Sequence, residues 1–318
     1  MKVLLTGAFG NIGFNTLQEL IRQGQTVRCF DLKTDKNEKK ARRVAGKAEV
    51  IWGDLRQTKE VAVALEGQEV IIHLGFVIPP AVDRDPATAY AVNVGGTRNV
   101  LEAAQRQEQP PKLLFASTFD VYGHTQDQEP PRKVSDPVQP TDDYTKHKVL
   151  CEELVQKSGL QWAIFRFCDI PQLEEPHRPQ PIMFTIPLNN RFEMLHPHDV
   201  ALALANGIRS PIWGKLWLIG GGASCLIRYG DYLQTMMERI GIGKLPVEAF
   251  STEPYCTDWL DSSESQALLQ YQRHSFAEII RDVAAAADPG PFVRLLMPLL
   301  RPLVRRSILN MSPYLKKK

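Results

Sequence analysis

Short apolar runs alternate with amphipathic stretches through the first half of the chain. The apolar runs predict buried strands at residues 2–6, 27–32, 50–52, 70–74, 113–117 and 161–167. Apolar residues recurring at helical spacing predict helices at residues 11–23, 61–65, 87–107 and 142–157. Strands that are apolar on both faces and alternate with helices are typical of a parallel sheet covered on both sides. The pattern therefore predicts an α/β fold with a doubly wound parallel sheet.

The pattern changes after residue 168. Prolines are frequent between residues 171 and 187, which predicts extended, irregular chain. The elements expected beyond them are a strand at 215–219 and helices at 198–209, 230–240 and 275–287. We therefore expect a sheet domain over residues 1–168, a small mixed C-terminal lobe over 169–290 and a tail over 291–318. The pattern leaves open that later segments return to the sheet domain.

Composition narrows the class of protein. The chain has 318 residues, of which 43% are hydrophobic and 23% charged, as in globular proteins with a sizeable core. Its 38 basic and 36 acidic residues nearly balance, which argues against nucleic acid as a partner. The five cysteines are scattered without a CxxC pair, and the apolar stretch at residues 3–5 is too short for a signal peptide. These features favour a soluble protein of the cytoplasm.

The tail has a composition of its own. Residues 291–318 carry seven basic residues and no acidic one, and apolar clusters alternate with the arginines. A basic amphipathic segment of this kind is suited to peripheral contact with a membrane, particularly one with anionic lipid. Packing on the lobe or on a partner subunit, with arginine stems covering apolar surface, explains the pattern equally well. Pro298 and Pro302 are expected to kink or break a helix here.

A glycine-rich turn joins the first strand to the first helix. It comprises Gly7, Phe9, Gly10, Asn11, Ile12 and Gly13, within the run TGAFGNIG. Glycines at such a turn allow a tight bend, a close approach to a pyrophosphate and close packing of helix on strand, and the helix N-terminus then attracts the phosphates. The turn therefore predicts a dinucleotide site.

Asp31 ends the second strand, 18 residues after Gly13. A carboxylate there accepts hydrogen bonds from the adenosine ribose and repels a 2′-phosphate, which favours NAD over NADP. A solvated turn residue is the plain alternative for Asp31. The lysines and arginines at residues 33–43 also leave NADP open, although such charge runs are usually exposed faces.

A Tyr-x-x-x-Lys pattern lies on the helix predicted at 142–157. Tyr144 and Lys148 are four residues apart and therefore share one helix face. A nearby ammonium is expected to lower the pKa of the tyrosine, which then exchanges a proton with a substrate hydroxyl while a nicotinamide takes part in hydride transfer. Ser117 and Thr118, at the end of a buried strand, are candidates to bind the substrate oxygen.

With these motifs in family order over about residues 1–210, the chain resembles the extended short-chain dehydrogenases/reductases of the NAD-dependent epimerase/dehydratase family. The resemblance implies a Rossmann-type domain with a small substrate lobe. It implies that Tyr144 is the catalytic acid/base, that Lys148 binds the nicotinamide ribose and that Thr118 binds the substrate oxygen, with Ser117 a weaker candidate. Further residues are implied to border the cofactor: Asp54, Leu55, His73, Leu74 and Gly75. Members often pair through helices like those at 87–107 and 142–157, so a homodimer stays open.

The chain departs from the family pattern where members that act on nucleotide sugars bind the diphosphate. Asp169 stands where those members commonly have an asparagine, and Phe192 stands where they have an arginine, with Arg191 one position away. A carboxylate beside a diphosphate is unfavourable. The apolar residues around them suit a less charged substrate, with lobe core as the alternative role: Phe167, Met183, Phe184, Ile186, Leu188 and Phe192.

His196 and His198 form an HxH pair, but the sequence shows no third ligand, so we expect no metal site. Three functions remain. The first is an NAD-dependent oxidoreductase acting on a small-molecule alcohol or ketone. The second is a nucleotide-sugar epimerase or dehydratase that recycles its NAD. The third is a non-catalytic NAD-binding protein.

Overall fold

The computed structural model describes residues 1–173, 179–288 and 290–315. The strands in these residues are β1 (Lys2–Thr6), β2 (Thr26–Asp31), β3 (Glu49–Trp52), β4 (Val70–His73), β5 (Lys112–Thr118), β6 (Trp162–Phe167), β7 (Arg191–Glu193), β8 (Lys215–Ile219) and β9 (Leu226–Arg228). The α-helices are α1 (Asn11–Arg22), α2 (Asp35–Arg42), α3 (Thr58–Leu65), α4 (Ala81–Arg84), α5 (Pro86–Tyr90), α6 (Gly96–Gln105), α7 (Asp143–Gln156), α8 (Pro197–Gly207), α9 (Tyr229–Arg239), α10 (Ser263–Leu269), α11 (Phe276–Ala286) and α12 (Pro291–Leu309). Short helical turns of other kinds are η1 (Ala91–Gly95), η2 (Phe119–Tyr122), η3 (Pro181–Phe184), η4 (Ala223–Cys225) and η5 (Val247–Ala249).

The main sheet confirms the predicted doubly wound fold. Its strand order is β3-β2-β1-β4-β5-β6-β8, and all neighbouring strands are parallel. The order reverses between β1 and β4, so a crevice is expected at the carboxyl ends of these two strands. Thr6 at the end of β1 lies level with Phe30 of β2 and His73 of β4, which places the turn after β1 at this crevice.

Helices bury both faces of the sheet, which explains why its strands are almost wholly apolar. On one face α1 packs against α8, with Leu17 and Leu204 in a shared core. On the other face α3, α6 and α7 contribute residues such as Leu65, Leu101 and Val155 to a second core. Burial on both faces removes the need for polar positions on the strands.

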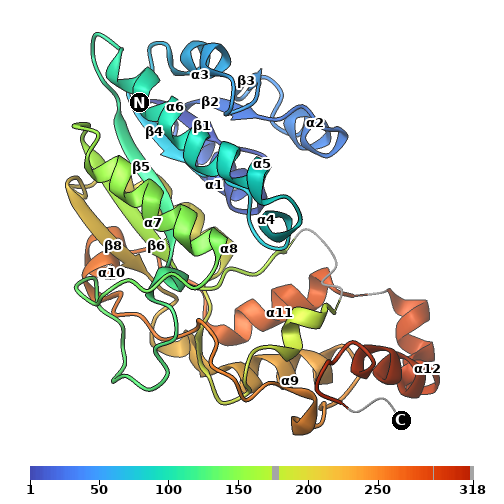
Figure 1. Ribbon diagram of the computed structural model, residues 1–318. Coiled ribbons are helices and arrows are strands. Elements are labelled where there is room, and N and C mark those ends of the chain that lie inside the picture. Colours follow the sequence, from blue (N-terminus) through green and yellow to red (C-terminus); the bar gives the residue numbers. More distant parts are fainter. Residues whose placement is uncertain (174–178, 289, 316–318) are drawn as a thin grey trace.

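A second lobe lies beyond the carboxyl ends of the strands. Its core contains Phe184, Phe192, Tyr229, Ile280 and Ile308, from η3, β7, α9, α11 and α12. The strands β7 and β9 form a small antiparallel ribbon within it. Figure 1 shows α9, α11 and α12 gathered together away from the sheet, with α12 at the outer edge.

Part of the chain beyond residue 168 returns to the sheet lobe. Strand β8 pairs with β6, and α8 packs on α1, where Gln23 donates a hydrogen bond to Asn206 at 2.9 Å. Within residues 197–219, α8 and β8 therefore belong to the sheet lobe, a possibility that the sequence pattern left open.

The helices differ from the sequence expectation in several places, and the short helices α4 and α10 were not expected at all. The helix expected at 87–107 is continuous but contains the wide turn η1, in which Asn93 lies buried. Helix α2 was not expected, because its strongly polar sequence has no apolar face and buries no residue. Helix α12 is unbroken through Pro298 and Pro302, so the expected break is wrong.

Both prolines of α12 are exposed and lie one turn apart on the same side of the helix. A proline removes one hydrogen bond of the helix, and at these exposed positions the helix continues without it. Across the described residues, no helix has the length and apolarity needed to cross a membrane.

Candidate active site

A cavity of about 800 Å³ opens at the carboxyl ends of the central strands and extends into the C-terminal lobe. The turn after β1 and the start of α1 line one part of it, with Gly7, Gly10, Asn11, Ile12 and Gly13. Side chains from η3, β7 and α9 line another part. Thr118, Tyr144 and Lys148 line the same cavity. Residues from three separate stretches of sequence therefore meet where the fold predicts a ligand.

The glycine-rich turn forms a cradle that side chains would fill. Gly7 has a φ of +65°, and a Cβ atom there would lie 2.8 Å from the backbone nitrogen of Gly75. A Cβ atom on Gly13 would overlap with the carbonyl oxygen of Gly7. Gly10 is the N-cap residue of α1 and has no side chain that could accept a hydrogen bond. The backbone N–H groups of the first helical turn, which borders the cavity, therefore have no side-chain cap. This cradle fits the pyrophosphate of a dinucleotide.

Asp31 supports the same turn from the end of β2. Its Oδ2 accepts a hydrogen bond from the backbone N–H of Phe9, and its Oδ1 accepts one from Leu32, both at 2.8 Å. Burial raises the pKa of Asp31, and these two hydrogen bonds oppose that shift. The Phe9 side chain is buried in the core against Trp52, so only the backbone of this predicted cofactor residue faces the turn.

Asp54 and Leu55 follow β3 and lie outside the described lining of the cavity. The Asp54 carboxylate pairs with Arg56 at 2.6 Å, which lowers the pKa of Asp54. The Leu55 side chain is buried and packs so closely on Gly75 that a Cβ atom there would lie 2.7 Å from it. Leu55 therefore acts on the cavity through packing in this structure.

The segment after β4 is tied to β1 through one threonine. The Thr6 hydroxyl bonds His73 Nδ1 at 2.7 Å and accepts hydrogen bonds from the N–H groups of Leu74 and Gly75, both at 3.1 Å. His73 Nε2 contacts Thr97 Oγ1 at 3.1 Å, and burial lowers the pKa of His73 to about 3, so the ring is neutral. Of the three predicted residues, Leu74 alone lines the cavity.

The predicted catalytic residues come from β5 and α7. Thr118 ends β5, and Tyr144 and Lys148 lie one turn apart on α7. The Lys148 ammonium donates a hydrogen bond to the carbonyl oxygen of Ala116 at 2.6 Å. Its Nζ lies 5.9 Å from the centroid of the Tyr144 ring and 3.7 Å from that of Phe76. Ammonium, phenol and hydroxyl thus converge on one side of the cavity.

The expectation that the pKa of Tyr144 is lowered is wrong for this structure. Burial and the nearby Asp120 raise the pKa of Tyr144, and only hydrogen bonding with Thr118 opposes this. Burial also lowers the pKa of Lys148 to about 8. The phenol therefore holds its proton at neutral pH, because losing it would place an anion in a buried site that already contains carboxyl groups.

Asp120 is a cavity residue that the sequence analysis missed. Its Oδ2 accepts a hydrogen bond from Thr118 Oγ1 at 2.9 Å, and burial raises the pKa of Asp120 to about 7. The predicted substrate residue Asp169 lines the same cavity, its Oδ2 has no hydrogen-bond partner among the described residues, and burial together with Asp120 raises its pKa well above the ordinary range. The sequence offered one indication of this role, because Asp120 follows Thr118 by two residues at the carboxyl end of a strand.

Ser117 lines the cavity but is committed to a buried ion pair. Its hydroxyl donates to Glu152 at 2.5 Å, and Glu152 also receives two hydrogen bonds from Arg166, at 2.9 and 2.6 Å. Both charged side chains are almost fully buried. This network fixes the end of β5 against α7, on which the Thr118–Tyr144 geometry depends.

The lobe side of the cavity is apolar and aromatic. Phe192, predicted to contact substrate, lines it and packs against Tyr229 and Tyr232 at centroid distances of 5.3 and 5.6 Å. Of the six apolar residues expected here, four line the cavity: Phe167, Met183, Ile186 and Phe192. Phe184 and Leu188 are not among its described lining, and Phe184 is lobe core. The sequence analysis missed the contribution of α9: Tyr229, Tyr232, Leu233, Met236 and Met237.

Arg191 is held away from this cavity. Its guanidinium bonds both carboxylate oxygens of Asp258, at 2.5 and 3.1 Å, and the backbone carbonyls of Thr125 and Gln128. Among the described lining residues, only Lys148 and His124 have side chains that can be cationic. The arginine nearest to the family's diphosphate-binding position therefore connects segments of the protein instead of facing the cavity.

The sequence showed no third histidine near His196 and His198, but the fold brings one close to them. His274 lies beside them, and one nitrogen of each ring lies within 4.8 Å of the others. The rings of His196 and His274 stack at 3.8 Å with an angle of 10° between their planes. Because a metal ligated by histidine lies near the ring plane, two stacked parallel rings do not converge on one ion. His274 Nδ1 instead bonds Asp199 at 2.6 Å.

A Rossmann-type sheet in which one cavity joins a glycine-rich turn to a half-buried tyrosine on the helix after β5 defines the short-chain dehydrogenase/reductase class. The chain belongs to the NAD dependent epimerase/dehydratase family, whose pattern matches residues 3–171. This finding confirms the resemblance on which the residue assignments depend.

Individual relatives differ in what they act on. The chain is 26% identical over 193 residues to a UDP-glucose 4-epimerase of Lacticaseibacillus casei, covering 57% of this chain and 56% of that protein. It is 30% identical over 154 residues to sterol demethylase protein B of Methylococcus capsulatus, covering 48% and 45%. A short-chain dehydrogenase/reductase superfamily structure from Agrobacterium tumefaciens with bound NAD shares the fold, with a TM-score of 0.77, 21% identity and coverage of 95% and 100%. The chain thus spans about half the length of these curated relatives.

Proposed function

We propose that the protein is an NAD-dependent oxidoreductase that interconverts a lipophilic, uncharged alcohol and its ketone. The observation that carries this proposal is the composition of the cavity beyond Tyr144. Its described wall combines methionine, isoleucine and aromatic side chains from η3, β7 and α9. Apolar lining with a few convergent polar groups is typical of sites for apolar small molecules.

NAD is the cofactor that the residues and the family favour. The cradle of Gly7 and Gly13 leaves room for a pyrophosphate, the family is described as NAD dependent, and a structure with the same fold holds NAD. Asp31 has lone pairs left for the ribose hydroxyls after binding two backbone N–H groups. Replacing Asp31 by serine should shift binding preference towards NADP, and an unaltered ratio of the two affinities would contradict the assignment.

The chemistry assigned to the chain is a proton transfer. When bound, NAD⁺ would accept a hydride from the carbon that carries the substrate oxygen, and NADH would return one in the reverse direction. Tyr144, which holds its proton in this site, donates it to the ketone oxygen during reduction and takes it back during oxidation. Thr118 donates a hydrogen bond to the same oxygen. Lys148 keeps a cation beside the phenol and favours any anion that forms there.

The alternative is a nucleotide-sugar epimerase or dehydratase, the activity in the name of the Lacticaseibacillus casei relative. Against it stand the commitment of Arg191 to Asp258 and the presence of Asp120 and Asp169 in the cavity. Carboxyl groups repel a diphosphate. In favour of an apolar substrate stands the sterol demethylase relative. The two functions differ in one observable, because net oxidoreduction changes nicotinamide absorbance in step with product and internal recycling does not.

The deciding experiment compares lipophilic secondary alcohols and ketones with UDP-sugars as substrates of the full chain. We expect turnover with the former, linked to nicotinamide absorbance. Tyr144→Phe should abolish turnover and leave NAD affinity unchanged within about twofold. Tyr255→Phe provides the control, since this tyrosine also lines the cavity but is not assigned a proton transfer. Turnover of a UDP-sugar without net absorbance change would overturn the proposal, and NAD binding without any turnover would favour a non-catalytic protein.

A further inference from the structure

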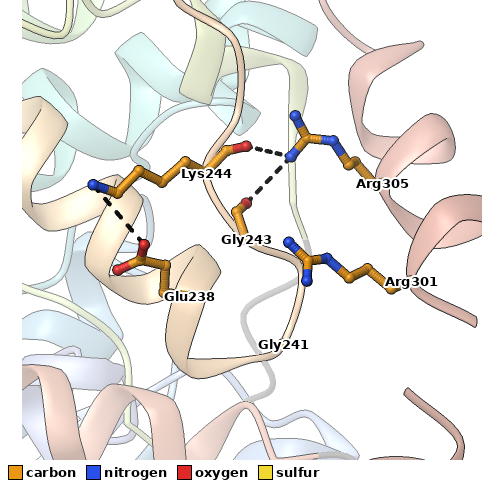
Figure 2. Close-up of a pocket in the computed structure, with 6 residues that line it drawn as sticks. All are labelled: Glu238, Gly241, Gly243, Lys244, Arg301 and Arg305. Atoms are coloured by element: carbon orange, nitrogen blue, oxygen red, sulfur yellow. Dashed lines mark hydrogen bonds and ion pairs between the residues drawn. The ribbon is translucent and has the colours of Figure 1, made fainter. Parts of the chain in front are cut away.

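Helix α12 contacts the lobe partly through two arginine side chains. Figure 2 shows Arg301 and Arg305 of α12 extending towards the loop after α9. The Nε of Arg301 donates to the carbonyl oxygen of Ile242 at 3.1 Å, and Arg305 donates to the carbonyls of Gly243 and Lys244. Apolar residues of the same helix also pack on the lobe core: Val304, Ile308 and Leu309. The inner face of α12 therefore combines these apolar side chains with Arg301 and Arg305.

A second set of apolar residues on α12 points outwards. Leu299 and Leu303 lie one helical turn apart, and their exposed fractions of 77% and 68% are the largest of any leucine described. Pro298 and Pro302 are exposed beside them. A surface helix ordinarily turns its leucines towards a core. These four residues instead form an apolar stripe on the outer side of α12, and no element within the described chain covers it.

The charge of the tail indicates which surface covers this stripe. Residues 291–318 carry seven basic residues and no acidic one. Two of the arginines are used on the lobe, while Arg306 is exposed next to the stripe. Apolar side chains flanked by cations suit the boundary between acyl chains and anionic headgroups, and a helix too polar to span lies flat there.

We infer that the outer face of α12 docks on an anionic lipid bilayer, with Leu299 and Leu303 entering the interface. The position of α12 adds a structural consequence. The loop that binds Arg301 and Arg305 begins directly after Ile240, which lines the large cavity. Ala287, at the end of α11 and shortly before α12, lines the same cavity. Docking therefore brings this end of the cavity close to the lipid.

The test is sedimentation of the full chain with vesicles of phosphatidylcholine alone and of phosphatidylcholine with phosphatidylglycerol in equal parts. We expect binding to the anionic vesicles only, weakened by salt because exposed charges are screened. Leu299→Asp with Leu303→Asp should weaken it by about tenfold or more, or about 1.4 kcal/mol. The control variant, Val63→Asp with Val134→Asp, adds the same charge at exposed apolar positions far along the chain from α12 and should bind as the parent does.

Several outcomes would overturn the inference. Absence of binding to anionic vesicles would do so, as would equal loss in the control variant. Self-association that the leucine substitutions abolish, without vesicle binding, would assign the stripe to a second copy of the chain. Because both leucines are exposed, the substitutions should leave thermal unfolding unchanged, and circular dichroism checks this independently of any enzymatic activity. The milder Leu299→Ser with Leu303→Ser removes the apolar surface without adding charge and should also weaken binding.

Discussion

The cradle of the glycine-rich turn makes a quantitative prediction, because two separate costs can be isolated there. Gly7→Ala places a side chain at a φ of +65° and 2.8 Å from the backbone of Gly75. The left-handed conformation costs about 1–2 kcal/mol for a non-glycine residue. Overpacking against backbone that cannot move away adds about 1–3 kcal/mol. The free energy of unfolding should therefore fall by about 2–5 kcal/mol.

Two further variants separate these costs. Gly46 has a φ of +75° with nothing within 4 Å of an added Cβ. For Gly46→Ala the free energy of unfolding should therefore fall only by the cost of the left-handed conformation, about 1–2 kcal/mol. Gly13 has no positive φ, but an added Cβ would overlap with Gly7. For Gly13→Ala the free energy of unfolding should therefore fall only by the cost of overpacking. Urea unfolding measures all three, and NAD titration should show weakened binding for the Gly7 and Gly13 variants alone. Equal destabilisation of Gly7→Ala and Gly46→Ala would refute the close approach as a constraint.

Two other predictions concern the acidic residues Asp120 and Glu152. The pKa of Asp120 is raised to about 7, so below that pH the acid is neutral and the Thr118 hydroxyl is free to donate to substrate. Ketone reduction should therefore decline as pH rises through about 7, and Asp120→Asn should flatten the profile; an unchanged midpoint would contradict the role. Glu152→Gln breaks the buried pair with Arg166 and should lower the free energy of unfolding by about 3–5 kcal/mol, whereas Glu153→Gln, in an exposed pair, should change it by less than about 1 kcal/mol.

The sheet and the position of the cavity were predictable because they depend on short-range patterns. Apolar runs reveal strands buried on both faces, and a glycine-rich turn marks the crevice where the strand order reverses. The convergence of Thr118, Tyr144 and Lys148 follows from the same rules, since a strand's carboxyl end and one face of the adjacent helix open on a single crevice. These residues required only the local sequence and the topology.

The electrostatics of the site were not predictable in the same way. The pKa of Tyr144 depends on its burial and on Asp120, and neither can be judged from a Tyr-x-x-x-Lys spacing. His274 joins His196 only through the packing of the segment before α11 on the start of α8, across a long stretch of sequence. The sequence also could not show whether Phe192 lines a cavity or belongs to a core, because an apolar residue is compatible with both positions.

The return of β8 to the edge of the sheet means that the protein cannot be shortened to its nucleotide-binding half. Ending the chain after residue 168 would remove the partner of β6, whose strand is almost wholly apolar and buried. It would also remove α8, which covers one face of the sheet next to α1. A fragment of this kind would present an unpaired hydrophobic edge to other molecules and should aggregate.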